Sequence, residues 1–266
     1  YFFERSIYEK RCYNGFGRAL PETELVLGPN ITDWPRQYPL GENLLLQLAA
    51  VIDDPVTTTD ELIPSGETSS YRSNPLRLAE FTLSRRVPDY VPRAKAAMAL
   101  ENARRAGEAP EPLLAALAQL GDAKALLAST QFGSCVFANR PGDGSAREQA
   151  ASCQKVLGTL ANICYDFATK RYRSNCINWG ILPFTLPEGA AFTLSPGDYL
   201  FVPGIRANVL QGIETIPANA IRADGGVESL TLCLKGLTPE EREILLEGCL
   251  MNHYAAHIGQ AERTKR

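Results

Sequence analysis

Apolar residues form one long run early in the chain and a series of short runs in its second half. Residues 44–52 are apolar except for one glutamine, and an Asp-Asp-Pro sequence ends the run. A short run of this kind fits a buried strand or a buried helix, and the long polar loop that follows favours a strand. From residue 132 onward, short apolar runs alternate with turns and with one helix over 145–157. This alternation predicts an α/β fold, with a mixed sheet and helices packed against it.

Between these two regions the sequence is typical of helices. Residues 76–84 and 90–105 combine helix-forming residues with recurring apolar positions. Residues 110–127 read as one or two Ala/Leu-rich helices, divided at Gly121. Together they predict a helical insertion around residues 76–128.

The last predicted helix has clear start signals. Thr238 is placed to cap it, Pro239 takes the first helical position, and two glutamates face the positive end of the helix. The only histidines of the chain, His253 and His257, are spaced four residues apart on this helix. Because no further ligands accompany them, a solvated helix face is favoured over a metal pair. The sequence therefore predicts no metal site and no histidine base in this chain.

The first forty residues have a different character from the rest. They are rich in aromatic residues, Gly and Pro, with turn signals at Asn14-Gly15 and at residues 28–30. We expect residues 1–40 to form an irregular interdomain linker and residues 41–266 to form one domain. The chain starts at Tyr1 without Met or an apolar leader, which is typical of a fragment, a processed chain or a trimmed chain.

Composition restricts the class of protein. With 266 residues and 45% hydrophobic content the chain can bury a full core, and its net charge of -3 leaves no excess of cations for phosphates or anionic lipid. No stretch reaches the roughly 18 uninterrupted apolar residues that span a bilayer. These features argue against nucleic-acid and membrane partners and predict a soluble protein.

The cysteines point to a reducing compartment. They are odd in number and widely spaced, and no pair has the Cys-x-x-Cys spacing of zinc or iron–sulfur sites: they are residues 12, 135, 153, 164, 176, 233 and 249. We expect free, mostly buried thiols, a cytoplasmic protein, and no cluster ligands within this chain.

The sharpest local motif is GDGSAREQAAS, residues 142–152, where a strand runs through a glycine-rich turn into a helix. Such a turn directs backbone N–H groups at an anion, and Arg147 can grip a carboxylate through two hydrogen bonds. Ser145 and Glu148 also fit a capping box, which needs no ligand. From the pattern alone the cap is the favoured interpretation, and the two interpretations are compatible.

Two other segments have similar alternatives. Residues 57–75 form a long polar loop in which Arg72 is placed either to grip a second carboxylate or to stay solvated, and composition favours solvation. The basic segment ATKRYRSNCINWGILPF, residues 168–184, has two possible roles. It either lines a groove or is a charged helix end whose cations interact favourably with the helix dipole.

Four of these motifs, TTDELIPSG, YRSN, GDGSARE and RYRSNCINWGILP, occur in the order and approximate spacing of the C-terminal part of aconitases and related hydratases. The resemblance covers roughly residues 40–255 and is closest to a divergent bacterial branch of aconitase-like hydratases. It implies a swivelling β/β/α three-layer domain that closes over a larger body holding a 4Fe–4S cluster. Asn175 and Gly180 match family positions in a structural turn.

The resemblance also implies roles for individual residues. Ser145 matches the serine whose alkoxide moves a proton next to a carboxylate, with Asp60 as a supporting acid. Arg72, Arg147 and Ala146 with its neighbouring amides match the positions that bind substrate. A serine is a useful base only among anion-stabilising donors, and a tricarboxylate needs several fixed cations, which suits this set.

The implied activity is a hydro-lyase reaction on a hydroxy di- or tricarboxylate such as citrate or isocitrate. It requires partner domains that carry the cluster, either in the same polypeptide or in a large subunit. Three positions depart from the family pattern: Ala146 replaces a serine, and Gln149 and Glu61 replace histidines. Two alternatives stay open, namely a catalytically silent carboxylate-binding domain and the small subunit of an isopropylmalate-dehydratase-type heteromer.

Overall fold

The computed structural model describes residues 2–11, 17 and 20–263, with side chains up to residue 257. The chain divides into two compact units, Tyr1–Ile31 and Thr32–Arg266. The first unit contains one short helix, α1 (Arg5–Glu9), and none of its described residues is buried. The predicted turn at Asn14-Gly15 lies outside the described residues. The division of the chain into a linker up to residue 40 and a domain from residue 41 stays a prediction.

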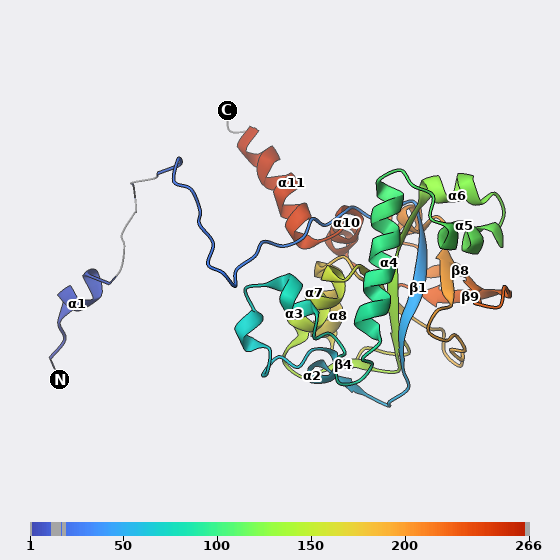
Figure 1. Ribbon diagram of the computed structural model, residues 1–266, viewed down its shortest axis with the longest axis horizontal. Helices are drawn as coiled ribbons and strands as arrows, with labels where there is room; N and C mark the ends of the chain where they lie inside the picture. The colour runs from blue at the N-terminus through green and yellow to red at the C-terminus, as the bar shows by residue number, and fades with distance from the viewer. Residues whose placement is uncertain (1, 12–16, 18–19, 264–266) are drawn as a thin grey trace. The chain divides into compact units, whose positions relative to one another are not determined.

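Seven strands of the second unit form a closed barrel (Figure 1). The first four are parallel neighbours, and the other three join them in antiparallel pairs. Around the barrel they are β1 (Asn43–Ile52), β3 (Thr130–Ala138), β5 (Thr159–Cys164), β6 (Leu182–Thr185), β9 (Val227–Cys233), β8 (Thr215–Ile221) and β7 (Tyr199–Val202). The mixed α/β class is confirmed, whereas the β/β/α layering stays a prediction.

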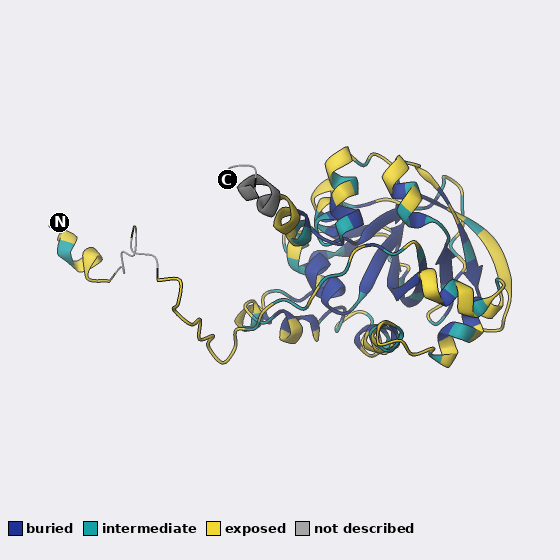
Figure 2. Ribbon diagram, turned by 90° about the horizontal axis from the view of Figure 1, so that it is seen from above, coloured by how far each residue is buried: buried dark blue, intermediate teal, exposed yellow. Residues whose placement is uncertain are grey.

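The apolar run at 44–52 is a strand, as expected, because both of its faces are covered. Leu44, Leu46 and Leu48 join the main core with side chains from β5 to β9. Leu45 faces the opposite way and packs with residues of the helical segment. A strand buried on both faces reads as a continuous apolar run rather than as an alternating one. In Figure 2 the strands at the centre of the unit are accordingly dark blue, and yellow is found on the outer faces of the helices and on the exposed part of β9.

The helical segment follows the prediction except at its start. The predicted helix at 76–84 ends early, at Ala79, and Leu83 has a φ of 54°, which an α-helix cannot contain. The segment consists of α3 (Pro75–Ala79), α4 (Tyr90–Arg105), α5 (Glu111–Ala118) and α6 (Ala123–Ser129). Helix α4 packs along β1 and β3 (Figure 1), which places the segment against the barrel.

The C-terminal part contains two helices where one was predicted. Helix α10 (Pro239–Glu247) starts as expected, with Thr238 and Glu241 in a capping box. It ends at Gly248, whose φ of 92° favours glycine, and a separate helix, α11 (Leu250–Arg263), follows. Strand β8 and helix α9 (Ile205–Gln211) were not predicted. None of the helices in the described part of the chain is long and apolar enough to cross a membrane.

Candidate functional site

Two segments predicted to carry chemistry lie side by side. Strand β2 (Thr57–Thr58) pairs in parallel with β4 (Pro141–Asp143), so the polar loop and the glycine-rich turn leave the same small sheet together. The contact is close at Gly144, where a Cβ atom would lie 2.4 Å from the Thr59 hydroxyl oxygen. With its φ of 122° as well, Gly144 is a position that only glycine fills without strain.

Ser145 does not cap the helix that follows it. Helix α7 (Arg147–Val156) begins two residues later, its N-cap is Ala146, and no side chain accepts a hydrogen bond from its first turn. The capping box expected for Ser145 and Glu148 is therefore wrong: Glu148 accepts a hydrogen bond from the Trp179 indole at 3.0 Å. Because alanine offers no side-chain acceptor, the first amides of α7 stay open to an anion.

Arg72 and Ser145 line the same shallow hollow beside the start of α7. Its volume is about 280 Å³, and its other lining residues are Ser65, Ala146, Glu148 and Gln149. Arg72 follows the short 3₁₀ helix η1 (Ser69–Tyr71) and is exposed. No carboxylate of the described residues forms an ion pair with it. The hollow thus combines a free guanidinium, an exposed hydroxyl and open helix amides, which together can hold a carboxylate.

Two of the predicted site residues do not line this hollow. The Asp60 carboxylate is exposed and pairs with Arg85 at 3.2 Å. Arg147 is partly buried, and its Nε has no hydrogen-bond acceptor within the described part of the chain. The structure therefore groups Arg72, Ser145 and Ala146 and leaves Asp60 and Arg147 outside the group.

The two remaining departures from the family pattern have different structural roles. Glu61 completes a capping box at the start of α2 (Thr59–Leu62), accepting a hydrogen bond from the Thr58 backbone amide at 2.7 Å. Gln149 instead lines the hollow. Glu61 thus stabilises the start of α2, whereas Gln149 changes the lining of the hollow that a ligand would contact.

The basic segment forms helix α8 (Lys170–Asn178). The prediction that its cations lie at the negative, C-terminal end of a helix is wrong. Its three cations lie in or near the first turn, at the positive end of the helix. The segment supports the glycine-rich turn instead. The Thr169 hydroxyl donates to the Gly142 carbonyl at 2.9 Å, and the Tyr172 ring lies where a Gly142 Cβ would be.

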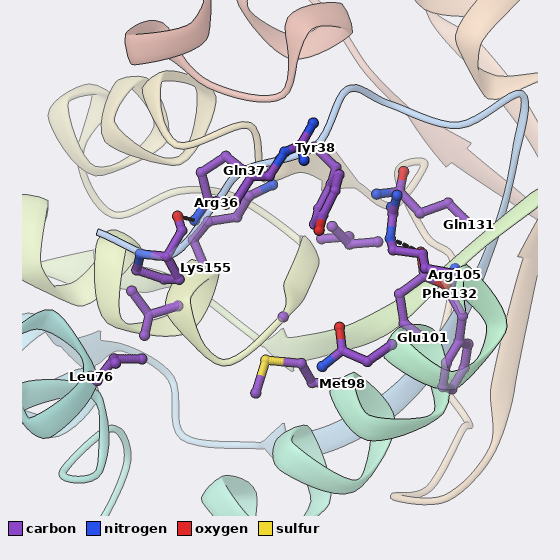
Figure 3. A pocket seen from close by; sticks show the side chains of 15 residues that line it. Arg36, Gln37, Tyr38, Leu76, Met98, Glu101, Arg105, Gln131, Phe132 and Lys155 are labelled. Carbon is purple, nitrogen blue, oxygen red and sulfur yellow. Dashed lines mark hydrogen bonds and ion pairs between the residues drawn. The ribbon is translucent and has the colours of Figure 1, made fainter. Parts of the chain in front are cut away.

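A second cavity, of about 330 Å³, lies on another part of the same unit (Figure 3). The segment 35–38 covers it, and Met98, Phe132 and Val156 are among its apolar lining residues. Its polar side includes Arg105, whose guanidinium lies 3.8 Å from the centre of the Tyr38 ring. Sequence reasoning missed this cavity, because its walls come from distant segments that carry no motif.

Lys155 is the buried cation of this cavity. It is 7% exposed, and its Nζ donates to the Gly180 carbonyl at 3.1 Å. Burial lowers the pKa of Lys155 to about 8, which the nearby Cys249 partly opposes and the Arg105 charge reinforces. A buried amine of this kind is half-neutral at about pH 8, whereas an ordinary lysine is still fully charged there.

This pKa predicts a pH-dependent stability. The pKa of Lys155 is about 8 in the fold against an ordinary value of 10.5, so the unfolded chain binds more protons between these values. The free energy of unfolding of the wild type should therefore rise with pH across this window. The rise should exceed that of Lys155→Met, which lacks the amine, by up to roughly 3 kcal/mol. Urea unfolding of both proteins between pH 7.5 and 10.5 measures the difference. Equal slopes for both would contradict it, and the exposed Lys170→Met serves as control.

The six cysteines in the described part of the chain are not arranged as an iron–sulfur site. All six described ones are free and buried, as expected: Cys135, Cys153, Cys164, Cys176, Cys233 and Cys249. Burial raises the pKa of Cys153 and of Cys176 to about 12, which keeps their thiols protonated, whereas cluster ligands are thiolates. No three cysteines of the described residues lie close enough together to bind one metal ion, so these residues do not fit a 4Fe–4S cluster. Cys12 lies outside them.

The two histidines are not placed as the sequence suggested. Both lie on α11, and His253 is buried, with only 6% of its surface exposed. A solvated face is therefore wrong for His253, although His257 is exposed. Neither histidine lines the hollow of Ser145.

Two curated proteins are similar to this chain. The aconitate hydratase A of Bradyrhizobium diazoefficiens is 28% identical over 116 residues, which cover 42% of this chain and 12% of that protein. The 3-isopropylmalate dehydratase small subunit of Metallosphaera sedula is 34% identical over 112 residues, covering 42% of this chain and 58% of that protein. The chain thus spans less than two thirds of the length of either relative. No protein-family model matches it.

Among solved structures, a crystal structure of 3-isopropylmalate dehydratase from Methanocaldococcus jannaschii overlaps with 83% of this chain and 99% of its own. The TM-score is 0.47 and the sequence identity is 20%.

Proposed function

The chain contains a swivel-type domain of the aconitase family, and we propose that it supplies one wall of a hydro-lyase active site. In this proposal its barrel and helices act as the swivelling β/β/α domain. The substrate is a hydroxy di- or tricarboxylate of the citrate and isocitrate class. The observation that carries the proposal is the hollow in which Arg72 and Ser145, from distant parts of the sequence, meet at the open start of α7.

In the proposed complex, Arg72 and the amides around Ala146 hold one carboxylate of the substrate. The Arg72 guanidinium has no acidic partner in the described part of the chain, so binding breaks no existing ion pair. The first amides of α7 add the partial positive charge of a helix end. These donors fix the acid beside the Ser145 hydroxyl.

Ser145 then moves the proton. Its alkoxide takes the proton from the carbon next to the carboxylate during dehydration and returns it during hydration. The hydroxide that leaves in the first direction needs a Lewis acid, and the residues that line the hollow at Ser145 include no cysteine or histidine that could hold one. We therefore assign the 4Fe–4S cluster to partner domains, in the same polypeptide or in a large subunit.

Arg147 and Asp60 take supporting roles in this proposal. The Nε of Arg147 is buried without a hydrogen-bond acceptor, which costs desolvation free energy. An anionic partner would supply the missing acceptor. Asp60 pairs with Arg85, which also pairs with Glu67, so its carboxylate helps to order the loop beside the hollow. Buried free thiols suit the cytoplasm as the place of action.

Two alternatives remain distinct from this proposal. A small subunit of an isopropylmalate-dehydratase-type heteromer is favoured by the match to the small subunit from Metallosphaera sedula. A silent carboxylate-binding domain is favoured by Gln149 and Ala146, which replace family residues at the hollow itself. Assembly with cluster-bearing domains separates them, because a silent domain binds the acid without turnover.

The first test is the binding of tricarballylate, a tricarboxylate that cannot be dehydrated. Arg72→Gln should lower its affinity for the chain by about 10-fold or more, because a charge-assisted hydrogen bond is lost. Isothermal titration calorimetry measures the affinity. Arg77→Gln is the matched control, because the Arg77 guanidinium lies over the Tyr71 ring and outside the hollow. Equal affinities for all three proteins would rule out the site.

A further inference from the structure

Three side chains with metal-binding atoms converge where α10 meets α11. Glu243 lies on α10, and His253 and His257 lie on α11. One ligating atom from each lies within 4.8 Å of the others. The two histidines share a helix face because residues four apart are neighbours on an α-helix, and their ring centres are 4.2 Å apart. The third ligand that the sequence lacked thus comes from the preceding helix.

The hydrogen bonds around the two rings determine which nitrogens are free. The Nδ1 of His257 lies 2.7 Å from the His253 carbonyl oxygen, which can only accept. The Nδ1 of His253 lies 2.9 Å from the Glu247 carboxylate, which accepts as well. In the neutral rings each Nδ1 therefore carries the hydrogen, and each Nε2 keeps a lone pair. A carboxylate or carbonyl behind a histidine in this way is the usual outer partner of a metal-bound imidazole.

We propose that Glu243, His253 and His257 bind one divalent transition-metal ion, with Zn²⁺ as the best fit. Two imidazoles and one carboxylate suit Zn²⁺ and its neighbours, whereas Mg²⁺ and Ca²⁺ take oxygen ligands. His253 is held in the packed interior, and the exposed Glu243 and His257 are free to close on the ion. Water takes the fourth position of the tetrahedron. The site is independent of the hollow at Ser145.

The bound ion would fasten α11 to α10. Without it, the two helices are joined through the turn at Gly248 and the contact between His253 and Glu247. An ion that binds only the folded arrangement stabilises it by mass action. The site is thus structural, and its effect is the attachment of the C-terminal helix.

The experiment is a titration of the full chain with ZnCl2 at pH 7.5 by isothermal titration calorimetry, with CoCl2 as a spectroscopic probe. We expect one ion per chain, a higher Tm with Zn²⁺, and the visible bands of tetrahedral Co²⁺. His257→Ala and Glu243→Gln should each weaken Zn²⁺ binding by about 10-fold or more, and Glu247→Ala by about 10-fold through the outer hydrogen bond. Both ligand substitutions are at exposed positions, which keeps the fold intact.

Glu240→Gln is the matched control, because it removes the same charge one turn earlier on α10 and should leave Zn²⁺ affinity unchanged. All these variants keep the seven cysteines, so binding by thiols would persist in His257→Ala. Wild-type affinity in His257→Ala, a sulfur-to-Co²⁺ charge-transfer band, or no heat of binding with Zn²⁺ would each overturn the proposal.

Discussion

Replacing Ser145 by alanine is expected to lower kcat by about 10²- to 10⁴-fold in the proposed assembly with cluster-bearing domains. The proposal makes the Ser145 alkoxide the base that takes the proton from the substrate carbon. Alanine removes this base and leaves Arg72 and the amides of α7 in place. KM and the affinity for tricarballylate should therefore change by only a few-fold. Steady-state rates with citrate, isocitrate and 3-isopropylmalate measure the effect.

Ser174→Ala is the control for this prediction. Ser174 is exposed on α8, away from the hollow, and its substitution should leave kcat unchanged. If Ser145→Ala retained the full rate on a substrate that the wild type converts, the assignment of the base would be wrong. If wild type and variant both bound the acid without turnover, the silent binding domain would be the correct alternative.

The parts of the fold that the sequence predicted are those in which local signals and packing agree. Residues 44–52 form a buried strand because neighbours cover both faces, and α10 starts at Thr238 because a full capping box is present. Strand β8 was missed because two of its four buried residues are alanines and Pro217 interrupts the run. Its place in the barrel depends on the pairing with β7 and β9, which no local pattern encodes.

The candidate site shows the same division. The sequence singled out Ser145 and Arg72 as separate motifs, and the resemblance related them. Their common hollow depends on the two-residue pairing of β2 with β4 and on the contact of Gly144 with Thr59. The expected capping box failed because α7 begins after Ala146, so a matching spacing did not produce the hydrogen bonds. The spacing of Ser145 and Glu148 is compatible with a capping box, but the capping hydrogen bonds form only if the helix begins directly after the serine.

Gly180 is the position where one methyl group should cost the most stability. It ends α8 in a Schellman motif: its amide donates to the Ile177 carbonyl and the Ile181 amide to the Cys176 carbonyl, both at 2.8 Å. Its φ is 64°, and a Cβ atom would lie 1.9 Å from the carbonyl oxygen of Gly248. The ends of α8 and α10 therefore meet backbone to backbone, with no side chain that can move aside.

Gly180→Ala should lower the free energy of unfolding by about 3–5 kcal/mol, the sum of left-handed strain and forced separation of the two helix ends. Gly189→Ala measures the left-handed strain alone. Gly189 has a similar φ of 76°, but no atom lies within 4 Å of its Cβ position. This substitution should cost only about 1–2 kcal/mol. Urea unfolding monitored by circular dichroism measures both. Equal losses in the two variants would mean that the approach of Gly180 to Gly248 contributes nothing, and that α8 and α10 are not packed end to end.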